Sequence, residues 1–543
     1  MSRHSKSVLL LYADKYYLLN QVFPVGLHLI SRHVRRRGHR AVMVHPFLPD
    51  RDYKSNIRDA IRRTEPDCVG IGIRNLDTCM SCEEHGDFEG HDYRTFYFLP
   101  QIKEVVVEIK NTIPHVPLVA GGGAFTVSPV AILTYLGLDY GIVGEGEEPF
   151  CRFIEAFPDE EKIRHIPNMV YRCQDGFKVN RRQPYSFDAD LALEDRDDGF
   201  DFALQATGVP VQVKRGCHHI CSYCVEPLIE GRRFVFRSID SVIHELKTIA
   251  DNLEGADRVF FVDTEFNLPD LGHGRALVRA ILREGLHEHF RFVTQLIPKP
   301  FDEPFAALLA EAHFSVIFSC ESFSNAVLGN NYISYGEKEI IGAIEASESA
   351  GLHCTVSLIF GLPGEDYKTM DHTLSRMKKY PVSPLRDYEY TIGGRIYQGT
   401  PLCEYVERNN PSRDLYGERS HGYLLPYYFC SPASPFDVHQ YVKEVFSDIL
   451  SYHKGYDDGS FEEVAIGYLS DHGIWAVAVE RFKRSAVGVQ SGIYDYLFKK
   501  LLHAGRQDDA RSISLAMLEN IDDGGDAIDS GQADVIRFYL SCL

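Results

Sequence analysis

Short apolar runs alternate with amphipathic stretches through the first 155 residues. A run of four or five apolar residues bounded by glycine or polar residues is typical of a buried strand. Apolar residues three and four positions apart are typical of a helix. Regular alternation of the two predicts an α/β fold with a doubly wound parallel sheet. The predicted strands are residues 8–11, 41–44, 69–73, 118–120 and 140–143, and the predicted helices are residues 25–37, 55–64 and 102–110.

The pattern changes at residue 156 and again near residue 205. Residues 169–179 predict a hairpin that turns at Asp175-Gly176, and the acid-rich stretch 188–201 predicts a linker. From residue 205 to residue 402 strand and helix signals alternate again, which predicts an open, partial (β/α)6 barrel of the TIM type. The predicted barrel strands are residues 209–213, 259–262, 292–294, 316–319, 355–360 and 388–391.

No strand is predicted after residue 401. Val438, Tyr441, Val442 and Val445 follow helical spacing, and similar spacing recurs to the end, so this region is expected to be helical. The expected organisation is an amino-terminal α/β domain over residues 1–155, a hairpin and linker over 156–204, a barrel over 205–402 and a helical region over 403–543.

Composition and charge narrow the class of protein. The chain has 543 residues, too many for one core, and its formal charge of −20 disfavours non-specific binding to nucleic acid or anionic membranes. An odd count of 13 cysteines disfavours a secreted disulfide framework. The first apolar run is too short for a signal peptide or a membrane span. We therefore expect a soluble, cytoplasmic protein with neither nucleic acid nor a membrane as partner.

Three cysteines lie close together just after the first predicted strand of the barrel. They are Cys217, Cys221 and Cys224. Thiolates are soft ligands that suit iron–sulfur clusters and zinc. Zinc usually needs a fourth ligand, which His218 or His219 could supply, and buried structural cysteines rarely cluster so tightly. The spacing favours a cluster in which one iron has no protein ligand.

This Cys-x3-Cys-x2-Cys arrangement, with Tyr223 before the third cysteine, resembles the signature of the radical S-adenosylmethionine (SAM) superfamily. Four later segments resemble the same superfamily in the same order: residues 262–267, 319–322, 359–365 and 395–401. The resemblance implies a 4Fe–4S cluster on the three cysteines, with SAM bound at the carboxyl ends of the barrel strands. The implied SAM contacts are Tyr223, Glu265, Ser319, Glu321, Gly361 and Arg395.

Glycine-rich loops follow two of the predicted strands in the amino-terminal domain. By themselves they favour a small-ligand site at the carboxyl ends of the strands, although ordinary strand–helix turns are also glycine-rich. Placed before this barrel, and with Pro24-x-Gly26-Leu27, they resemble the cobalamin-binding radical SAM enzymes. That resemblance implies a Rossmann-like cobalamin-binding domain with a glycine-lined slot for the nucleotide tail. The implied contacts are Gly121, Gly122, Gly123, Phe125, Gly144, Glu145 and Gly146.

No histidine is expected as a cobalt ligand. The loop 13–18 lacks the Asp-x-His-x-x-Gly motif of many cobalamin proteins, and His28 and His439 lie within predicted helices. The segment 70–77 instead resembles the Ile-Arg-Asn motif of the subgroup that includes tryptophan 2-C-methyltransferase. This resemblance implies that Arg74 lies under the cobalt as a catalytic, non-coordinating cation. The alternative is an Arg74 paired with Asp77 or with a phosphate.

Cys79 and Cys82 form a second close pair, Cys-x2-Cys, with Cys68 and His85 nearby. Such a pair is half of a common zinc site. No second pair is evident nearby, so we do not predict zinc here, and the role of the two cysteines stays open.

The resemblance implies a cobalamin-dependent radical SAM methyltransferase. Such an enzyme moves a methyl group from SAM by way of methylcobalamin to a small-molecule or peptide substrate, with an electron donor such as flavodoxin or ferredoxin. A non-methylating oxidoreductase or cyclase with the same cofactors is the first alternative. A cobalamin-binding sensor is the second, and the intact cysteine triplet argues against it. The sequence does not identify the substrate: Tyr427, Tyr428, Phe429 and Trp475 are expected in the core rather than in a pocket.

Overall fold

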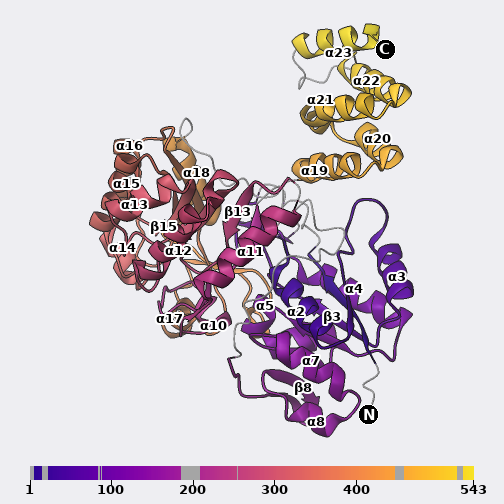
Figure 1. The fold of residues 1–543 in the computed structure, drawn as a ribbon. Coiled ribbons are helices and arrows are strands. Elements are labelled where there is room, and N and C mark those ends of the chain that lie inside the picture. Colours follow the sequence, from indigo (N-terminus) through magenta and orange to yellow (C-terminus); the bar gives the residue numbers. More distant parts are fainter. Residues whose placement is uncertain are drawn as a thin grey trace. The chain divides into compact units, whose positions relative to one another are not determined.

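The chain forms two compact units, which are described separately (Figure 1). The first comprises residues 1–14, 22–45 and 57–455, and the second comprises residues 15–21, 46–56 and 456–543. Within them the computed structural model describes residues 5–14, 23–83, 86, 88–184, 208–253, 255–446, 458–522 and 530–542. The predicted linker 188–201 lies outside the described residues.

A seven-stranded sheet forms the amino-terminal part of the first unit, in the order β2-β1-β3-β6-β7-β8-β9. The first five strands of this order are parallel. The predicted hairpin, β8 and β9, extends the sheet: β8 pairs antiparallel with β7, and β9 pairs antiparallel with β8. The order reverses between β1 and β3, which is the topological switch point where such folds bind ligands. The strands are β1 (Ser7–Tyr12), β2 (Arg40–Val44), β3 (Cys68–Gly72), β6 (Leu118–Gly121), β7 (Tyr140–Ile142), β8 (Met169–Cys173) and β9 (Gly176–Val179).

Helices connect the parallel strands of this sheet. The first, α2, buries Leu27, Leu29 and Val34, and the chain turns after it at Gly38, whose φ of 83° suits glycine. The predicted alternation of strand and helix is therefore confirmed. The helices are α2 (Val25–Arg36), α3 (Tyr53–Thr64), α4 (Leu99–Thr112), α5 (Gly123–Val127), α6 (Pro129–Leu136), α7 (Glu147–Ala156) and α8 (Glu160–Arg164).

Six parallel strands in chain order form the open barrel that the sequence predicts. Buried and partly exposed residues alternate along β15, β16 and β17, and the rings of Phe261, Phe292 and Phe314 stack with centroids 4.9–5.9 Å apart. The strands are β10 (Val209–Val211), β13 (Arg258–Phe261), β14 (Arg291–Leu296), β15 (Phe314–Glu321), β16 (His353–Phe360) and β17 (Arg386–Ile392). The helices between them are α11 (Ile239–Asn252), α12 (Leu271–Arg283), α13 (Glu303–Glu311), α14 (Asn325–Asn330), α15 (Glu337–Ala350) and α16 (Tyr367–Lys379).

The expectation that strands stop at residue 401 is wrong. A small antiparallel sheet joins β18 (Gly394–Arg395) to β20 (Tyr427–Phe429) and β19 (Leu415–Gly417), and it packs with α17 (Pro401–Asn409). Strands of two or three residues are too short to show a period of two, which explains the error. Tyr427, Tyr428 and Phe429 are buried, as expected for core residues. A helix, α18 (Pro435–Phe446), follows this sheet.

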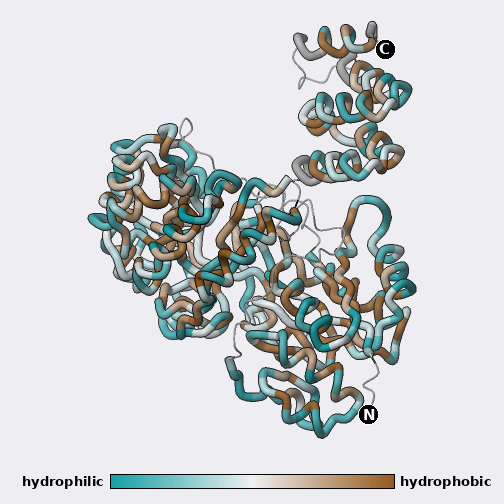
Figure 2. The backbone as a smooth tube through the Cα atoms, viewed as in Figure 1, coloured by the Kyte–Doolittle hydropathy of each residue, from teal (hydrophilic) through white to brown (hydrophobic). Residues whose placement is uncertain are grey.

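The second unit contains helices at its carboxyl-terminal end, as predicted, and its hydrophobic positions recur at helical spacing (Figure 2). Buried side chains such as Leu469, Phe482, Leu497 and Ile513 come from successive helices and fill the space between them. No helix in the described part of the chain is long and apolar enough to cross a membrane. The helices are α19 (Asp458–Asp471), α20 (Trp475–Arg484), α21 (Val487–His503), α22 (Gln507–Asp522) and α23 (Ser530–Cys542).

Candidate functional site

The cysteine loop lies at the carboxyl end of β10, between the short strand β11 (Lys214–Arg215) and the single-turn helix α10 (Glu226–Ile229). Gly216 has φ 98°, and a Cβ there would lie 2.2 Å from the carbonyl oxygen of Arg233. Only glycine allows the two chain segments to come so close. The backbone N–H of Cys217 then donates to the carbonyl of Gly231 at 3.0 Å. The loop is therefore fixed by its own backbone.

The three thiols lie near one another, because the charges of Cys217 and Cys224 both contribute to raising the pKa of Cys221. Burial is the largest cause of the raised pKa of Cys217, Cys221 and Cys224. A thiol held protonated is a poor nucleophile, whereas a bound cationic metal would stabilise the thiolate. The environment therefore suits metal ligands rather than a catalytic nucleophile.

A tetrahedral zinc ion needs ligands that converge on one metal ion. An iron–sulfur cube binds each thiolate through a different iron, so its ligands are spaced apart. The donor set fits the cluster that the sequence predicts.

A group of buried charges lies beside the loop. The Lys214 ammonium donates to the carbonyl of Thr264, and the Asp263 carboxylate accepts from the backbone N–H groups of Val213 and Lys214 at 2.7 and 2.9 Å. One oxygen each of Asp263 and Glu265 is buried without a hydrogen-bond partner. Burial raises the pKa of Asp263 to about 6 and of Glu265 to about 7. These two oxygens are suited to accept hydrogen bonds from a cationic ligand, such as the ammonium group of an amino acid.

Four of the predicted SAM contacts are brought together at the ends of β13 and β15. The Ser319 hydroxyl donates to Glu265 at 2.8 Å, and the Tyr223 hydroxyl donates to Glu321 at 2.6 Å. Glu265 and Glu321 both have positive φ, at 55° and 56°, where residues other than glycine are uncommon. Tyr335 also donates to Glu321, and no motif in the sequence indicated it.

Gly361, another predicted SAM contact, follows β16 with φ 89°. A Cβ on it would lie 2.6 Å from the sulfur of Cys430, so the chain itself requires glycine at this position. Its contact with SAM stays a prediction.

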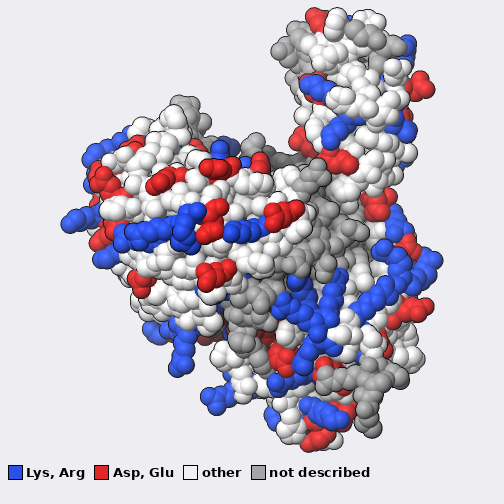
Figure 3. Space-filling model, viewed as in Figure 1, with Lys and Arg blue, Asp and Glu red and all other residues white. Residues whose placement is uncertain are grey.

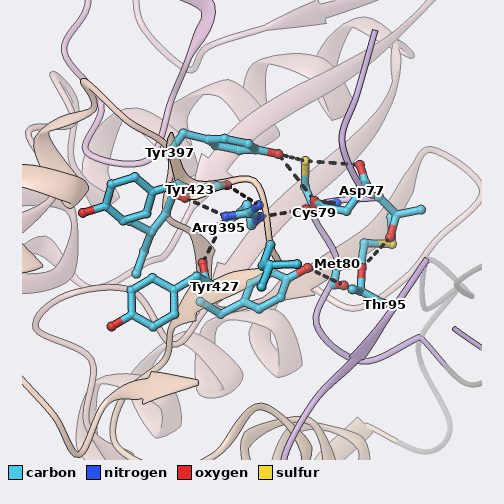
Figure 4. Close-up of polar contacts among 12 residues, drawn as sticks. Asp77, Cys79, Met80, Thr95, Arg395, Tyr397, Tyr423 and Tyr427 are labelled. Carbon is cyan, nitrogen blue, oxygen red and sulfur yellow. Dashed lines mark hydrogen bonds and ion pairs between the residues drawn. The ribbon is translucent and has the colours of Figure 1, made fainter. Parts of the chain in front are cut away.

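Arg395, predicted as a SAM contact, is engaged within the protein (Figure 4). Its Nε lies 2.8 Å from Oδ2 of Asp77, and both side chains are buried. The guanidinium also donates to the carbonyls of Ile396 at 2.7 Å and Tyr423 at 3.0 Å. Asp77 therefore pairs with Arg395 in this structure. The pair links the segment after β3 to the start of the small sheet, and a direct contact of Arg395 with SAM stays a prediction.

The two sulfurs of the second cysteine pair contact different parts of the chain. The sulfur of Cys79 lies 2.9 Å from the hydroxyl of Tyr397, whereas the sulfur of Cys82 donates to the carbonyl of Pro435 at 3.2 Å. Cys79 has φ 61°, and its backbone N–H donates to Asp77 at 3.0 Å. Figure 4 shows Cys79 between Asp77 and Tyr397. Tyr397 lies within the predicted motif 395–401 but was not itself predicted.

Arg74 lies two residues after β3, at the carboxyl edge of the sheet beside the switch point, and it is exposed. Its guanidinium hydrogen-bonds the hydroxyl of Tyr12, the last residue of β1. Its charge also lowers the pKa of Glu226, which burial raises to about 7. Glu226 lies two residues after Cys224, so the Arg74 charge acts on the segment that follows the cysteine loop.

The first glycine loop packs against this same edge and against the barrel. Gly122 has φ 107°, and a Cβ there would lie 2.4 Å from the carbonyl oxygen of Ile73. A Cβ on Gly123 would lie 3.2 Å from the carbonyl oxygen of Arg74 and 3.3 Å from Ile229 of α10. The chain itself therefore requires glycine at Gly122, whatever it contributes to a ligand, whereas a Cβ at Gly123 would need only a small shift of its neighbours. A Cβ on Gly121 would lie 3.7 Å from the carbonyl oxygen of Ile142, which is an ordinary contact.

The second glycine loop is occupied by an arginine that the sequence did not indicate. A Cβ on Gly144 would lie 2.3 Å from Nε of Arg182, and this guanidinium donates to the carbonyls of Leu228 and Ile229. Burial raises the pKa of Glu145, whose Oε2 is buried without a hydrogen-bond partner. Gly146 precedes α7. A nucleotide tail in this slot would have to displace Arg182.

Phe125 is fully buried against Gly141, so its ring packs in the core, and a contact with a cofactor stays a prediction.

The histidines behave as expected for packed residues. His28 is buried in α2, and burial lowers its pKa to about 3. His439 lies in α18, where its ring nitrogen is 3.3 Å from the hydroxyl of Tyr390. Residues 15–22, which form most of the loop after β1, lie outside the described residues. His45, at the end of β2, is buried and is 2.9 Å from the carbonyl of Asp14.

Residues 211–377 match the radical SAM superfamily. Among curated proteins, tryptophan 2-C-methyltransferase of Streptomyces laurentii is 25% identical over 423 residues, which cover 66% of this chain and 68% of that protein. An uncharacterized methyltransferase of Pyrococcus horikoshii is 25% identical over 395 residues, covering 71% of this chain and 79% of that protein.

Solved structures share the fold over nearly the whole chain. The radical SAM methyltransferase TsrM of Kitasatospora setae, solved with cobalamin and a 4Fe–4S cluster, superposes with a TM-score of 0.70. It is 20% identical, and the match covers 88% of this chain and 99% of TsrM. The cobalamin-dependent radical SAM enzyme OxsB, solved with aqua-cobalamin, gives a TM-score of 0.63 at 13% identity, covering 98% of this chain and 75% of OxsB.

Proposed function

We propose that the chain is a radical SAM enzyme similar to tryptophan 2-C-methyltransferase, and that it is a cobalamin-dependent methyltransferase acting on a small molecule or a peptide. Its cofactors are a 4Fe–4S cluster, SAM and cobalamin. The proposed reaction carries a methyl group from SAM to the substrate by way of the bound cobalamin.

One observation carries this proposal: the two predicted cofactor sites share a boundary, the helix α10. This helix begins two residues after Cys224, and it packs against α5. The glycine turn before α5 contacts Ile229, and Arg182 binds the carbonyls of Leu228 and Ile229. Two cofactors that exchange a group must lie close together, and this packing supports such a placement.

Different residues of the chain would bind the cluster and the ammonium group of SAM. Cys217, Cys221 and Cys224 would hold the cluster, whose free iron would supply a position for the amine and the carboxylate of SAM. The buried, unpartnered oxygens of Asp263 and Glu265 would bind the ammonium group. Both lie at the end of β13, so one strand positions them.

Arg74 would supply a fixed positive charge at the switch point. A guanidinium does not lose its proton at working pH and is a poor metal ligand, so it would leave the lower face of a corrin uncoordinated. Arg74 is exposed at the carboxyl ends of the strands, where ligands of this fold bind. This position supports the role that the motif implies.

The test is a product analysis with the anaerobically reconstituted holoenzyme. The enzyme, cobalamin, a reductant and SAM carrying a trideuterated methyl group are incubated with tryptophan and then with other metabolites and short peptides. Methyl transfer adds one trideuteromethyl group in place of one hydrogen. A product without that mass gain identifies a cyclase or oxidoreductase and overturns the proposal. The Cys217, Cys221, Cys224→Ala variant is the control and should form no product.

A further inference from the structure

Five exposed residues lie in the cysteine loop and in the segment that crosses it, and the mechanism above does not use them. They are Ile220 and Phe236, which are 42% and 38% exposed, together with the exposed residues His218, Arg232 and Arg233. Large apolar side chains left in water beside charged ones mark an interaction surface. We call these five residues the loop patch.

The backbone fixes the patch to the predicted cluster ligands. The segment before β12 (Val235–Phe236) crosses Gly216, where the carbonyl oxygen of Arg233 would be 2.2 Å from a Cβ. β12 pairs antiparallel with β11, which leads into the cysteine loop. His218 and Ile220 lie between Cys217 and Cys221. The patch therefore belongs to the cysteine loop itself and to the segment that crosses the loop at Gly216.

The patch is locally cationic in an anionic chain. Arg232 and Arg233 form no ion pair within the described part of the chain, although the whole chain carries a formal charge of −20. Basic side chains also gather over α2 and α3 (Figure 3), but those helices belong to the amino-terminal sheet and not to the cysteine loop. Two adjacent free guanidinium groups beside Ile220 and Phe236 would attract an acidic protein and then bury apolar surface against it.

We propose that the loop patch docks a small, acidic, one-electron carrier protein that reduces the cluster. The inference rests on the proposed function, since such a partner has a role only if the chain holds a redox-active cofactor. One electron leaves the carrier's cofactor and enters the cluster, and no bond or proton is exchanged. Electron transfer slows steeply with distance, so a carrier must dock where the protein cover is thinnest. A small, wet, charge-steered contact is typical of electron-transfer complexes.

The test compares two reductants on the reconstituted holoenzyme, with bleaching of the cluster's visible absorption as the readout. Reduced flavodoxin, an acidic carrier, needs a docking surface, whereas photoreduced deazariboflavin is small and uncharged. The variant is Arg232→Glu with Arg233→Glu, and the matched control is Arg62→Glu with Arg63→Glu, an exposed arginine pair on α3.

Flavodoxin should reduce the Arg232→Glu/Arg233→Glu variant at least tenfold more slowly than wild type at low salt, and the wild-type rate should fall as salt rises. The control pair should change the rate less than about twofold. Deazariboflavin should reduce all three proteins equally. Phe236→Ala should weaken flavodoxin binding, measured by titration, without changing the iron content.

Two results distinguish a failure of the docking inference from a failure of the proposed function. If flavodoxin reduces the loop-patch variant as fast as wild type while deazariboflavin reduces both, the docking inference is wrong and the proposed function stands. If deazariboflavin bleaches no cluster in wild type, the proposed function itself fails. Should the double variant lose its iron, the salt dependence of the wild-type rate and the Phe236→Ala titration decide: a salt-independent rate and unchanged binding overturn the inference.

Discussion

The buried pair of Asp77 and Arg395 links the segment after β3 to the small sheet after the barrel, and we call this contact the joint. Replacing Asp77 by alanine should destabilise the joint. The change leaves the Arg395 charge without its counterion, where the exposed fractions of the two side chains are 0% for Asp77 and 2% for Arg395. Removing one partner of a buried ion pair costs about 3–5 kcal/mol. Arg395 keeps the carbonyls of Ile396 and Tyr423 as acceptors, which favours the lower half of that range.

Amide hydrogen exchange is the suitable assay, because a chain with two units and several cofactors does not unfold in one step. Amides of β18 and β20 should exchange faster in Asp77→Ala by roughly two to three powers of ten. Arg164→Ala is the control: its pair with Glu160 is 48% and 68% exposed, so the change should stay below about 1 kcal/mol.

A second variant keeps the reasoning testable if Asp77→Ala does not fold. Asp77→Ala with Arg395→Met removes both charges, so it should recover most of the lost protection. Exchange in Asp77→Ala within threefold of wild type would refute the claim that the pair holds the joint. So would a double variant no better protected than the single one.

Three further changes test other parts of the structure. Gly122→Ala should cost roughly 1–3 kcal/mol in backbone strain and add a clash with the Ile73 carbonyl. The control is Gly137→Ala, because Gly137 also has a positive φ but a Cβ there would have no atom within 4 Å. Thermal unfolding should show a larger loss of stability for Gly122→Ala than for Gly137→Ala. Burial raises the pKa of Glu365 from 4.5 to about 7, so its contribution to stability is fully present below about pH 4.5 and is lost as pH rises through 7. Glu365→Gln should therefore be more stable than wild type by up to roughly 3 kcal/mol at pH 8 and not at pH 4.5, and equal gains at both would contradict this. Arg74→Leu should still bind cobalamin, seen by its visible spectrum, but transfer methyl more slowly; an unchanged rate would make Arg74 only structural.

Long, periodic elements were predictable from the sequence. All five parallel strands of the first sheet and all six barrel strands lie within a few residues of their predictions, because buried parallel strands give apolar runs that stand out between helices. The short strands β11, β12, β18, β19 and β20 gave no such signal. Their pairing depends on contacts far apart along the chain, as between Arg395 and Tyr428.

The candidate site was predictable where a motif fixes both residue type and spacing. The cysteines, Glu265, Ser319 and Glu321 came from motifs, and the structure places them around one group of strand ends. Partners supplied by other elements could not be read from a local pattern. Asp77 pairs with Arg395, 318 positions away, and Arg182 reaches the carbonyl of Leu228 from beyond the hairpin.

The methylation state of the bound cobalamin tests the central claim most directly, because it requires no knowledge of the substrate. The anaerobic holoenzyme is reduced and mixed with SAM that carries a trideuterated methyl group. The mass of the extracted cobalamin is then measured by mass spectrometry. The account predicts that cobalamin gains one trideuteromethyl group while an equal amount of S-adenosylhomocysteine appears, and that the gain is much slower in Arg74→Leu. Cobalamin that stays unmethylated while SAM is consumed would contradict the proposed methyl transfer.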